Sequence, residues 1–140
     1  TVHGFAQVIG VLTLLPLSDY LGRKKTIVIV NSFLAASLFG IVLSGQSWTM
    51  LYVLVGLFAV FYGPTFPIYG ACAGDYFPKR VMGTVIGAWT PFYGLGAILS
   101  HWVTGLLRDS TGVYTLAFVT NGVMALAGLA LILFVQKRPS

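Results

Sequence analysis

Charged side chains are scarce in this sequence. Only 8% of its 140 residues are charged, and glutamate is absent, whereas a soluble domain carries about 25%. So few charges cannot cover a water-facing surface of this size, which argues against a soluble enzyme, a nucleic-acid-binding module and a disordered tail. A single cysteine is present, so no disulfide can form within the chain, and cysteine usage indicates no compartment.

Long uncharged stretches make up most of the chain. Apolar residues account for 57%, and the mean hydropathy is +0.91. The uncharged or nearly uncharged stretches cover residues 1–18, 26–44, 49–72, 83–107 and 114–136. A hydrocarbon core of about 30 Å is crossed by about 20 helical residues, and the stretches lack the alternation of barrel strands. The sequence therefore predicts an all-α, polytopic membrane domain of five transmembrane helices over residues 1–140.

The first stretch begins at Thr1 and is slightly short for a span. It has neither the basic start nor the small-residue cleavage site of a signal peptide. We therefore expect a helix that is cut at its outer end, and a chain that is a fragment of a longer protein or is processed from one.

Basic residues fall mostly on one side of the expected membrane. The groups at 19–25 and 75–80, with the C-terminal Lys137 and Arg138, hold seven of the eight Lys and Arg residues, whereas Arg108 falls on the other side. The positive-inside rule puts the basic side and the C-terminus in the cytoplasm, at a plasma or inner membrane. Contact with anionic lipid head groups, worth about 1 kcal/mol per residue, explains the basic excess. No nucleic-acid partner is therefore expected.

A charged loop follows the first expected span. Asp19 and Arg23 are four residues apart and can pair across a turn, and Gly22 permits a tight reversal. The loop resembles the signature Gly-x-Leu-x-Asp-Arg-x-Gly-Arg-Arg/Lys of the major facilitator superfamily of transporters. The matching positions are Leu17, Asp19, Gly22, Arg23 and Lys24, and the departures are Leu15 for the first Gly and Tyr20 for the Arg. An ordinary juxtamembrane charged loop is the alternative.

The fourth expected span carries a second resemblance. Gly87 and Gly96 match the glycine motif of the family's fifth helix, whereas Ser100 and His101 replace its Gly and Pro. Such a degenerate copy resembles the equivalent helix of the family's second half, and residues 105–114 resemble the loop between helices eleven and twelve. The resemblance implies helices eight to twelve of the C-terminal half, with the missing N-terminal half as a partner. Assignment to helices two to six remains the alternative. The absence of an Arg in the third span argues against it.

Polar and aromatic side chains inside the spans are candidates for lining a substrate path. Tyr62 and Tyr69 are seven residues apart on one helical face, and the prolines between them predict a kink. The path candidates are Gln7, Tyr62, Tyr69, Trp89, Tyr93 and Ser100, and the titratable candidates are His3 and His101. The alternative for the aromatics is packing or an interfacial belt, and for the histidines it is a hydrogen bond to a carbonyl. Asn31 and Asn121 are expected to form hydrogen bonds between helices.

The resemblance implies a secondary transporter that moves a small solute by rocking two halves around a central site. Residues 69–77, followed by Gly83, resemble monocarboxylate and oxalate/formate-type carriers, which indicates a small organic anion. The sequence has no HExxH, no Gly-x-Ser-x-Gly and no carboxylate pair, so we expect no enzyme, and neither a cofactor nor a metal. A non-transporting membrane anchor or assembly subunit remains the alternative.

Overall fold

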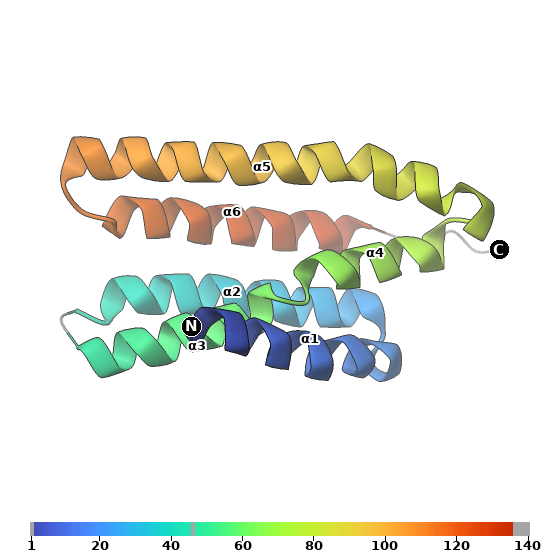
Figure 1. Ribbon diagram of the computed structural model, residues 1–140, viewed down its shortest axis with the longest axis horizontal. Helices are drawn as coiled ribbons and strands as arrows, with labels where there is room; N and C mark the ends of the chain where they lie inside the picture. Colours follow the sequence, from blue (N-terminus) through green and yellow to red (C-terminus); the bar gives the residue numbers. More distant parts are fainter. Residues whose placement is uncertain (1, 46, 136–140) are drawn as a thin grey trace.

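Helices make up nearly all of the fold. The computed structural model describes residues 2–45 and 47–135. Its elements are α1 (Val2–Leu21), α2 (Arg23–Leu43), α3 (Trp48–Tyr62), α4 (Thr65–Tyr76), the short 3-10 helix η1 (Lys79–Val81), α5 (Met82–Thr111) and α6 (Thr115–Phe134). Five segments are long and apolar enough to cross a membrane: His3–Leu21, Arg23–Leu43, Trp48–Tyr76, Lys79–Thr111 and Thr115–Phe134. The described chain is therefore an all-α bundle of five long apolar helical segments, as the sequence predicted (Figure 1).

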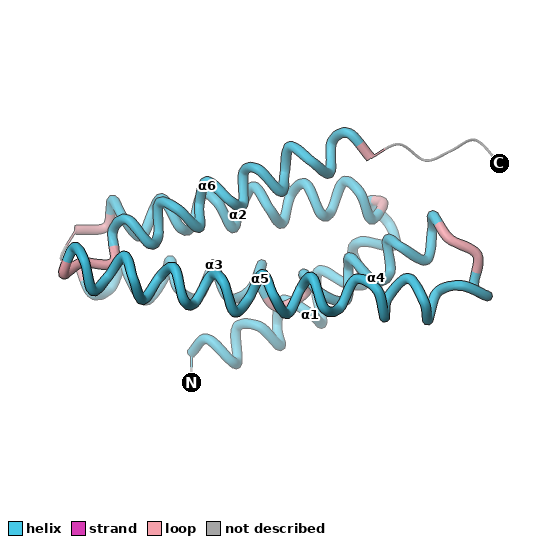
Figure 2. The backbone as a smooth tube through the Cα atoms, turned by 90° about the horizontal axis from the view of Figure 1, so that it is seen from above, coloured by secondary structure: helices cyan, strands magenta, loops and turns pink. Residues whose placement is uncertain are grey.

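Helix α2 lies at the centre of the packing. It runs beside α6 in both views (Figures 1 and 2) and also contacts α1, α3 and α4. Half of its apolar window is buried, whereas none of the window in α5 is. Helix α5 has its main contacts with α4, η1 and α6, so it forms one edge of the bundle.

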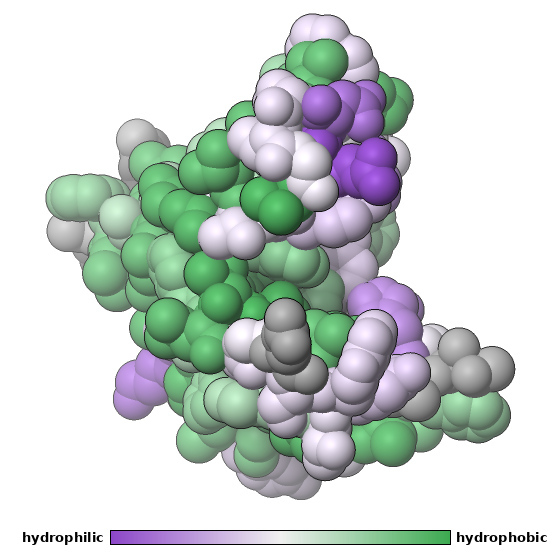
Figure 3. Space-filling model, turned by 90° about the vertical axis from the view of Figure 1, so that its left-hand side faces the viewer, coloured by the Kyte–Doolittle hydropathy of each residue, from purple (hydrophilic) through white to green (hydrophobic). Residues whose placement is uncertain are grey.

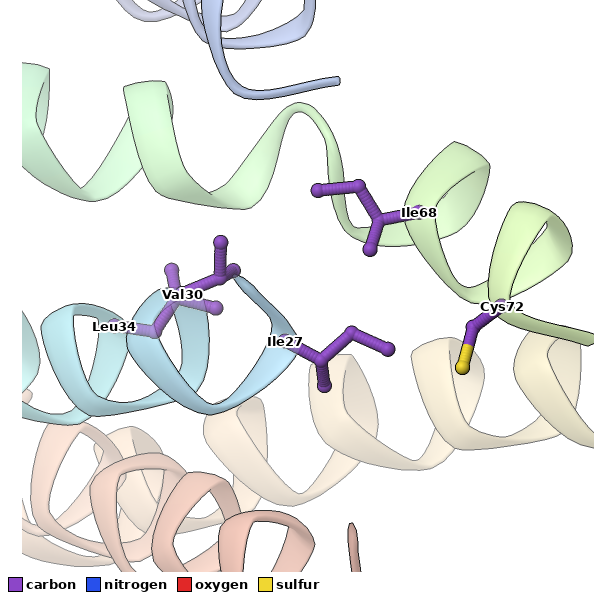
Figure 4. Packing of buried hydrophobic residues seen from close by; sticks show 5 residues of the cluster. All are labelled: Ile27, Val30, Leu34, Ile68 and Cys72. Carbon is purple, nitrogen blue, oxygen red and sulfur yellow. The ribbon is translucent and has the colours of Figure 1, made fainter. Parts of the chain in front are cut away.

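A cluster of buried apolar side chains joins α2 to α4. Ile27, Val30 and Leu34 of α2 point towards Ile68 and Cys72 of α4 (Figure 4). The three residues of α2 are spaced by three and four, so they fall on one helical face. Cys72, the single cysteine of the chain, packs in this apolar cluster as a free thiol.

The third apolar stretch is divided into two helices. Helix α3 ends at Tyr62 and α4 begins at Thr65, and the chain changes direction between them (Figure 1). Pro64 has no N–H to donate into the preceding turn, which ends the hydrogen-bond ladder of α3. The expected proline kink is therefore a full break between two helices rather than a bend in one.

Helices α1 and α3 approach each other at two glycines. A Cβ on Gly63 would lie 2.5 Å from the carbonyl oxygen of Gln7, and a Cβ on Gly10 would overlap the carbonyl oxygen of Val60. Real Cβ atoms do not come so close to backbone atoms, so only glycine permits this packing. The contact places α1 against the C-terminal end of α3 and determines where Gln7 lies.

A pair of helices recurs in the structure at an interval of 90 residues. The junction of α1 and α2 corresponds to that of α5 and α6 at Asp19 and Asp109, Gly22 and Gly112, and Asn31 and Asn121. Both glycines have positive φ, 90° and 73°. Both asparagines donate to the carbonyl four residues earlier, at 3.1 and 2.8 Å. This agreement in sequence, backbone and hydrogen bonding indicates an internal structural repeat.

Helix α5 is longer than the expected span at 83–107. Its 30 residues, from Met82 to Thr111, give a length of about 45 Å, which exceeds a hydrocarbon core of about 30 Å. One end of the helix therefore reaches beyond the apolar zone. Figure 3 shows that end of the molecule, where hydrophilic residues gather at the top, near the turn from α5 to α6, and hydrophobic residues cover the flank.

Candidate functional site

Three adjoining cavities lie between α5 and the helices α2 to α4, and one of them also reaches α1 and α6. The first, of about 600 Å³, is lined by Tyr69, Cys72 and Trp89 among others. The second, of about 440 Å³, shares Tyr69 and Trp89 with the first and extends to Tyr62 and Ser100. The third, of about 520 Å³, shares Tyr62 and Ser100 with the second. Neighbouring cavities share lining residues, so the three lie side by side, and together we call them the corridor.

Most of the polar candidates from the sequence lie along this corridor. Its lining includes Tyr62, Tyr69, Trp89, Tyr93 and Ser100, with His3 and His101 towards one end. Gln7 lies instead at the contact of α1 with α3, where its backbone packs on Gly63. Its side-chain amide nitrogen is 3.0 Å from Nε2 of His3. The structure therefore brings together residues from α1, α3, α4 and α5 that the sequence singled out separately.

An aromatic cluster forms one wall of the corridor. The Trp89 ring centroid lies 4.9 Å from Phe66, 5.7 Å from Tyr93 and 6.1 Å from Tyr69. The rings of Phe66 and Tyr93 meet edge to face at 5.2 Å. Such arrangements suit the quadrupoles of the rings and hold them in fixed relative positions. Phe66, which joins α4 to Trp89 and Tyr93 of α5, was not among the sequence candidates.

The two histidines occupy different surroundings at the far end of the corridor. The ring of His3 stacks near Phe58 and Tyr62, with centroids 6.3 and 6.4 Å away. The Nδ1 atom of His101 lies 2.7 Å from the carbonyl oxygen of Ala97 on its own helix. The carbonyl hydrogen bond considered for the histidines is therefore present at His101.

Two asparagines make the hydrogen bonds between helices that the sequence indicated. Asn31 of α2 donates to the hydroxyl oxygen of Tyr69 on α4 at 2.9 Å. Asn121 of α6 accepts from the hydroxyl of Ser100 on α5 at 2.8 Å and donates weakly to Thr104 at 3.4 Å. Each amide thus ties one corridor residue to a neighbouring helix.

Formal charge is excluded from the corridor in the described residues. None of the residues that line its three cavities is Asp, Glu, Lys or Arg. Within residues 2–45 and 47–135, no group of three or more His, Cys, Asp or Glu could hold a metal ion. Its polar chemistry therefore rests on hydroxyl, amide, imidazole and indole groups.

Charged residues form a separate cluster at the junction of α1 and α2. Arg23 pairs with Asp19 at 2.6 Å and with Asp75, at the end of α4, at 3.4 Å. The same guanidinium also donates to the hydroxyl of Ser18 at 3.3 Å. Gly22 lies between the carboxylate and the guanidinium at φ 90°, a backbone conformation that glycine adopts without steric cost.

The neighbouring lysine contacts a different helix. Nζ of Lys24 donates to the carbonyl oxygens of Leu133 and Val135, at 3.0 and 2.6 Å. These carbonyls lie at the C-terminal end of α6, where backbone acceptors lack partners in the helix and partial negative charge accumulates. Lys24 therefore caps α6 from α2. Lys137 and Arg138, which the sequence assigned to the same side, lie outside the described residues.

The sequence did not predict that Asp75 pairs with Arg23 of the charged loop, or that Asn31 bonds to Tyr69 of the corridor. Asp75 lies 52 residues from Arg23, and Asn31 lies 38 residues from Tyr69. No short-range spacing encodes either contact. The 90-residue repeat can be found in the sequence. It places Asn31 and Asn121 at equivalent positions and so indicates that both have similar structural roles.

Comparison with known proteins gives a family match over the whole chain. A family model described as Major Facilitator Superfamily matches residues 1–140. The chain is 28% identical over 128 residues to the glucose-6-phosphate exchanger SLC37A2 of Danio rerio, covering 89% of this chain and 25% of that protein. It is 31% identical over 131 residues to the protein of the same name from Bos taurus, with the same coverage. The chain thus spans about a quarter of the length of these curated relatives. No solved structure matches it.

Proposed function

Because the chain belongs to the major facilitator superfamily, we propose that it is part of a secondary transporter that moves a small organic anion across a membrane by alternating access. The corridor is the observation that carries this proposal. It follows grooves between helices, and its lining includes aromatic and polar side chains. Binding sites of such transporters lie near the middle of the membrane, between repeated helical units.

The five spans, approximately 1–18, 26–44, 49–72, 83–107 and 114–136, form a single transmembrane domain in this proposal. We assign them to helices eight to twelve of the C-terminal half, and the missing N-terminal half is their partner. The degenerate glycine motif at Gly87 and Gly96 supports this assignment. The coverage of only 25% of each curated relative is compatible with a part of a longer transporter.

The charged loop has the role of a conformational latch in this proposal. Asp19, Gly22, Arg23 and Lys24 form the loop, and Asp75 joins it to α4. Residues of this loop would contact the other half in one of the two states. An ion pair at a surface that opens and closes contributes differently to the two conformations, which is the requirement for a switch.

Two independent observations favour an organic anion as the solute. Residues 69–77 resemble the corresponding region of monocarboxylate and oxalate/formate-type carriers. The curated relatives are named glucose-6-phosphate exchangers, and a sugar phosphate is also an organic anion. Since no Lys or Arg lines the corridor in the described residues, the cation that balances the solute would come from the other half.

The membrane orientation follows from the basic residues. We place the charged loop and the C-terminus in the cytoplasm of a multi-pass protein of the plasma or inner membrane. Anionic lipid head groups are partners of the basic residues on this side. Aromatic residues near the span ends, such as Trp48, suit the interfacial belt, and Trp48 is 73% exposed.

Transport assays on the protein expressed from its complete reading frame test the proposal. Proteoliposomes preloaded with oxalate, lactate or glucose 6-phosphate are expected to take up the same labelled anion by counterflow, and liposomes without protein are not. Trp89→Ala is expected to reduce this uptake, whereas Trp48→Ala, away from the corridor, is expected to leave it unchanged. If none of the three anions is transported, the proposed function is contradicted and the anchor or assembly subunit is favoured.

A further inference from the structure

The amide of Asn31 has a fixed orientation. Its Nδ2 atom lies 3.1 Å from the carbonyl oxygen of Ile27 and 2.9 Å from the hydroxyl oxygen of Tyr69. A backbone carbonyl can only accept a hydrogen bond. The atom facing Ile27 must therefore be the nitrogen, because the amide oxygen would repel the carbonyl there. Asn31 is buried, at 8% exposure, so water does not offer an alternative arrangement.

This orientation determines the direction of the bond to Tyr69. Both hydrogens of the Asn31 amide are used, one on the Ile27 carbonyl and one on the phenol oxygen. The phenol oxygen therefore accepts. Its own hydrogen is available to donate elsewhere, and no other described residue receives it in a hydrogen bond. Tyr69 lines both the first and the second cavity of the corridor.

Two other polar groups of the corridor present the opposite polarity. The hydroxyl of Ser100 donates to the amide oxygen of Asn121, whose nitrogen is turned towards the Ala117 carbonyl. The hydrogen of Ser100 is thus occupied, and its lone pairs remain. His101 faces the Ala97 carbonyl with Nδ1, so in the neutral ring this atom carries the hydrogen and Nε2 is an acceptor. An anionic oxygen is repelled by both.

The three phenols of the corridor also differ in how they are held. Tyr62, Tyr69 and Tyr93 line it. The Tyr93 hydroxyl faces the side chains of Tyr62 and Thr65, which are themselves hydroxyl groups, whereas the Tyr69 hydroxyl is held by a side-chain amide. A donor that is already oriented costs little reorganisation when a ligand arrives. Among these groups, Tyr69 is therefore the best placed to bind an oxygen that carries negative charge.

We propose that Tyr69 donates a hydrogen bond to a carboxylate or phosphate oxygen of the transported solute, and that Asn31 is the residue that positions it. This inference rests on the proposed function and specifies one contact of its binding site. It assigns to Asn31 a role beyond joining α2 to α4. It also assigns the charged end of the solute to the Tyr69 region of the corridor, away from Ser100 and His101.

Transport kinetics of three variants test the inference. Initial rates with oxalate, lactate and glucose 6-phosphate are measured in proteoliposomes with the complete protein, Tyr69→Phe, Asn31→Leu and the double variant. Loss of a hydrogen bond to a charged group weakens binding about tenfold or more, so KM is expected to rise by about that factor in each single variant, with a smaller change in Vmax. The double variant is expected to resemble Tyr69→Phe, because both changes remove one coupled interaction.

Ser37→Ala provides a matched control. Ser37 is also buried on α2, at 1% exposure, and its hydroxyl bonds only to the carbonyl of Phe33 in the same helix. Its replacement is expected to leave KM unchanged. If Tyr69→Phe also leaves KM unchanged while lowering thermal stability, the contact with Asn31 is structural only and the inference is wrong.

A spectroscopic measurement separates this inference from the proposed function. The Raman doublet of tyrosine depends on whether the phenol accepts or donates hydrogen bonds, and a difference between the complete protein and Tyr69→Phe isolates the signal of Tyr69. This signal is expected to be that of an accepting phenol, to change in Asn31→Leu, and to shift towards a donor when oxalate, lactate or glucose 6-phosphate binds. A shift without transport would support the inference and contradict the proposed function. No shift with any of the three anions would overturn the inference, whether or not transport occurs.

Discussion

Single residues in this protein act through contacts that cross between helices. Arg23 is the clearest case, because one guanidinium at the start of α2 binds Asp19 at the end of α1 and Asp75 at the end of α4. Its planar group offers several donors in a fixed geometry, which a lysine ammonium does not. The loop motif is therefore completed by a residue that lies far along the chain.

Replacement of Arg23 by lysine tests this arrangement. Arg23→Lys keeps the charge but cannot hold both carboxylates and Ser18 in the same geometry. The side chains are partly exposed, so the expected loss in the free energy of unfolding is modest, about 1 kcal/mol. Thermal denaturation in detergent measures it, with Lys25→Arg as the control. Equal stability of Arg23→Lys and the unaltered protein would mean that the ion pairs contribute nothing measurable.

The close approach of α1 and α3 depends on Gly10 and Gly63, and Gly10 offers the sharper test. Gly10→Ala introduces a methyl group that meets the Val60 carbonyl, and the helices must separate to accommodate it. Overpacking of this kind costs about 1–3 kcal/mol. Gly4→Ala on the same helix meets no atom within 4 Å and is expected to leave stability unchanged or slightly raised. Similar unfolding curves for both variants would contradict the described packing.

At the scale of helices, ends and junctions carry much of the specificity. The break between α3 and α4 comes from Pro64, and the turns after α1 and α5 depend on glycines with positive φ. Helix α6 is closed at its end by Lys24, a residue of α2. These helices are apolar along their whole length. The residues that specify each helix are therefore found mainly where it begins and ends.

The cap on α6 leads to a local prediction. In Lys24→Met, the carbonyls of Leu133 and Val135 lose their charged donor, and the last turn of α6 is expected to open more often. The cost is about 0.3–1 kcal/mol. Faster hydrogen exchange in peptides from the end of α6 measures it, while Lys25→Met serves as a comparison. If exchange in α6 does not change, the two hydrogen bonds of Lys24 do not stabilise the helix end.

The turn after α5 has its own test. Gly112 lies at φ 73°, where a side chain costs about 1–2 kcal/mol. Gly112→Ala is therefore expected to lower the free energy of unfolding by about that amount, measured by thermal or denaturant unfolding. Gly105→Ala lies within α5 with no atom near the added methyl group, and it is expected to be tolerated. Equal effects of the two substitutions would argue against the left-handed conformation.

At the scale of the molecule, the distribution of basic residues predicts orientation. In a Cys72→Ala background, Lys79→Cys is expected to react with a membrane-impermeant maleimide only from the cytoplasmic side, and Arg108→Cys only from the opposite side, because the positive-inside rule assigns them so. Labelling of intact cells and of inverted vesicles measures both. Lys79 and Arg108 lie at opposite ends of one span. If both cysteines react from the same side, this segment does not cross the membrane and the arrangement of five spans is wrong.

The repeat of α1 and α2 in α5 and α6 also belongs to this scale. It relates Asn31 to Asn121, yet their partners differ, a phenol on α4 in one case and a serine on α5 in the other. Two equivalent positions therefore give the corridor a donor at one place and an acceptor at another. The two units of the repeat thus have the same fold but present different hydrogen-bonding groups to the corridor.

Composition and the order of apolar and charged residues determined that the chain is an all-α membrane bundle, because uncharged stretches of about 20 residues have few other stable states in lipid. The charged loop and the turn glycines were also readable, since their chemistry acts over a few residues. The contact of Asp75 with Arg23, the bond from Asn31 to Tyr69 and the grouping of Phe66 with Trp89 required the tertiary structure. In a chain that is apolar on every helical face, hydrophobic periodicity does not indicate which faces meet. Close packing at glycines and a few directed hydrogen bonds decide that, and both depend on residues far apart in the sequence.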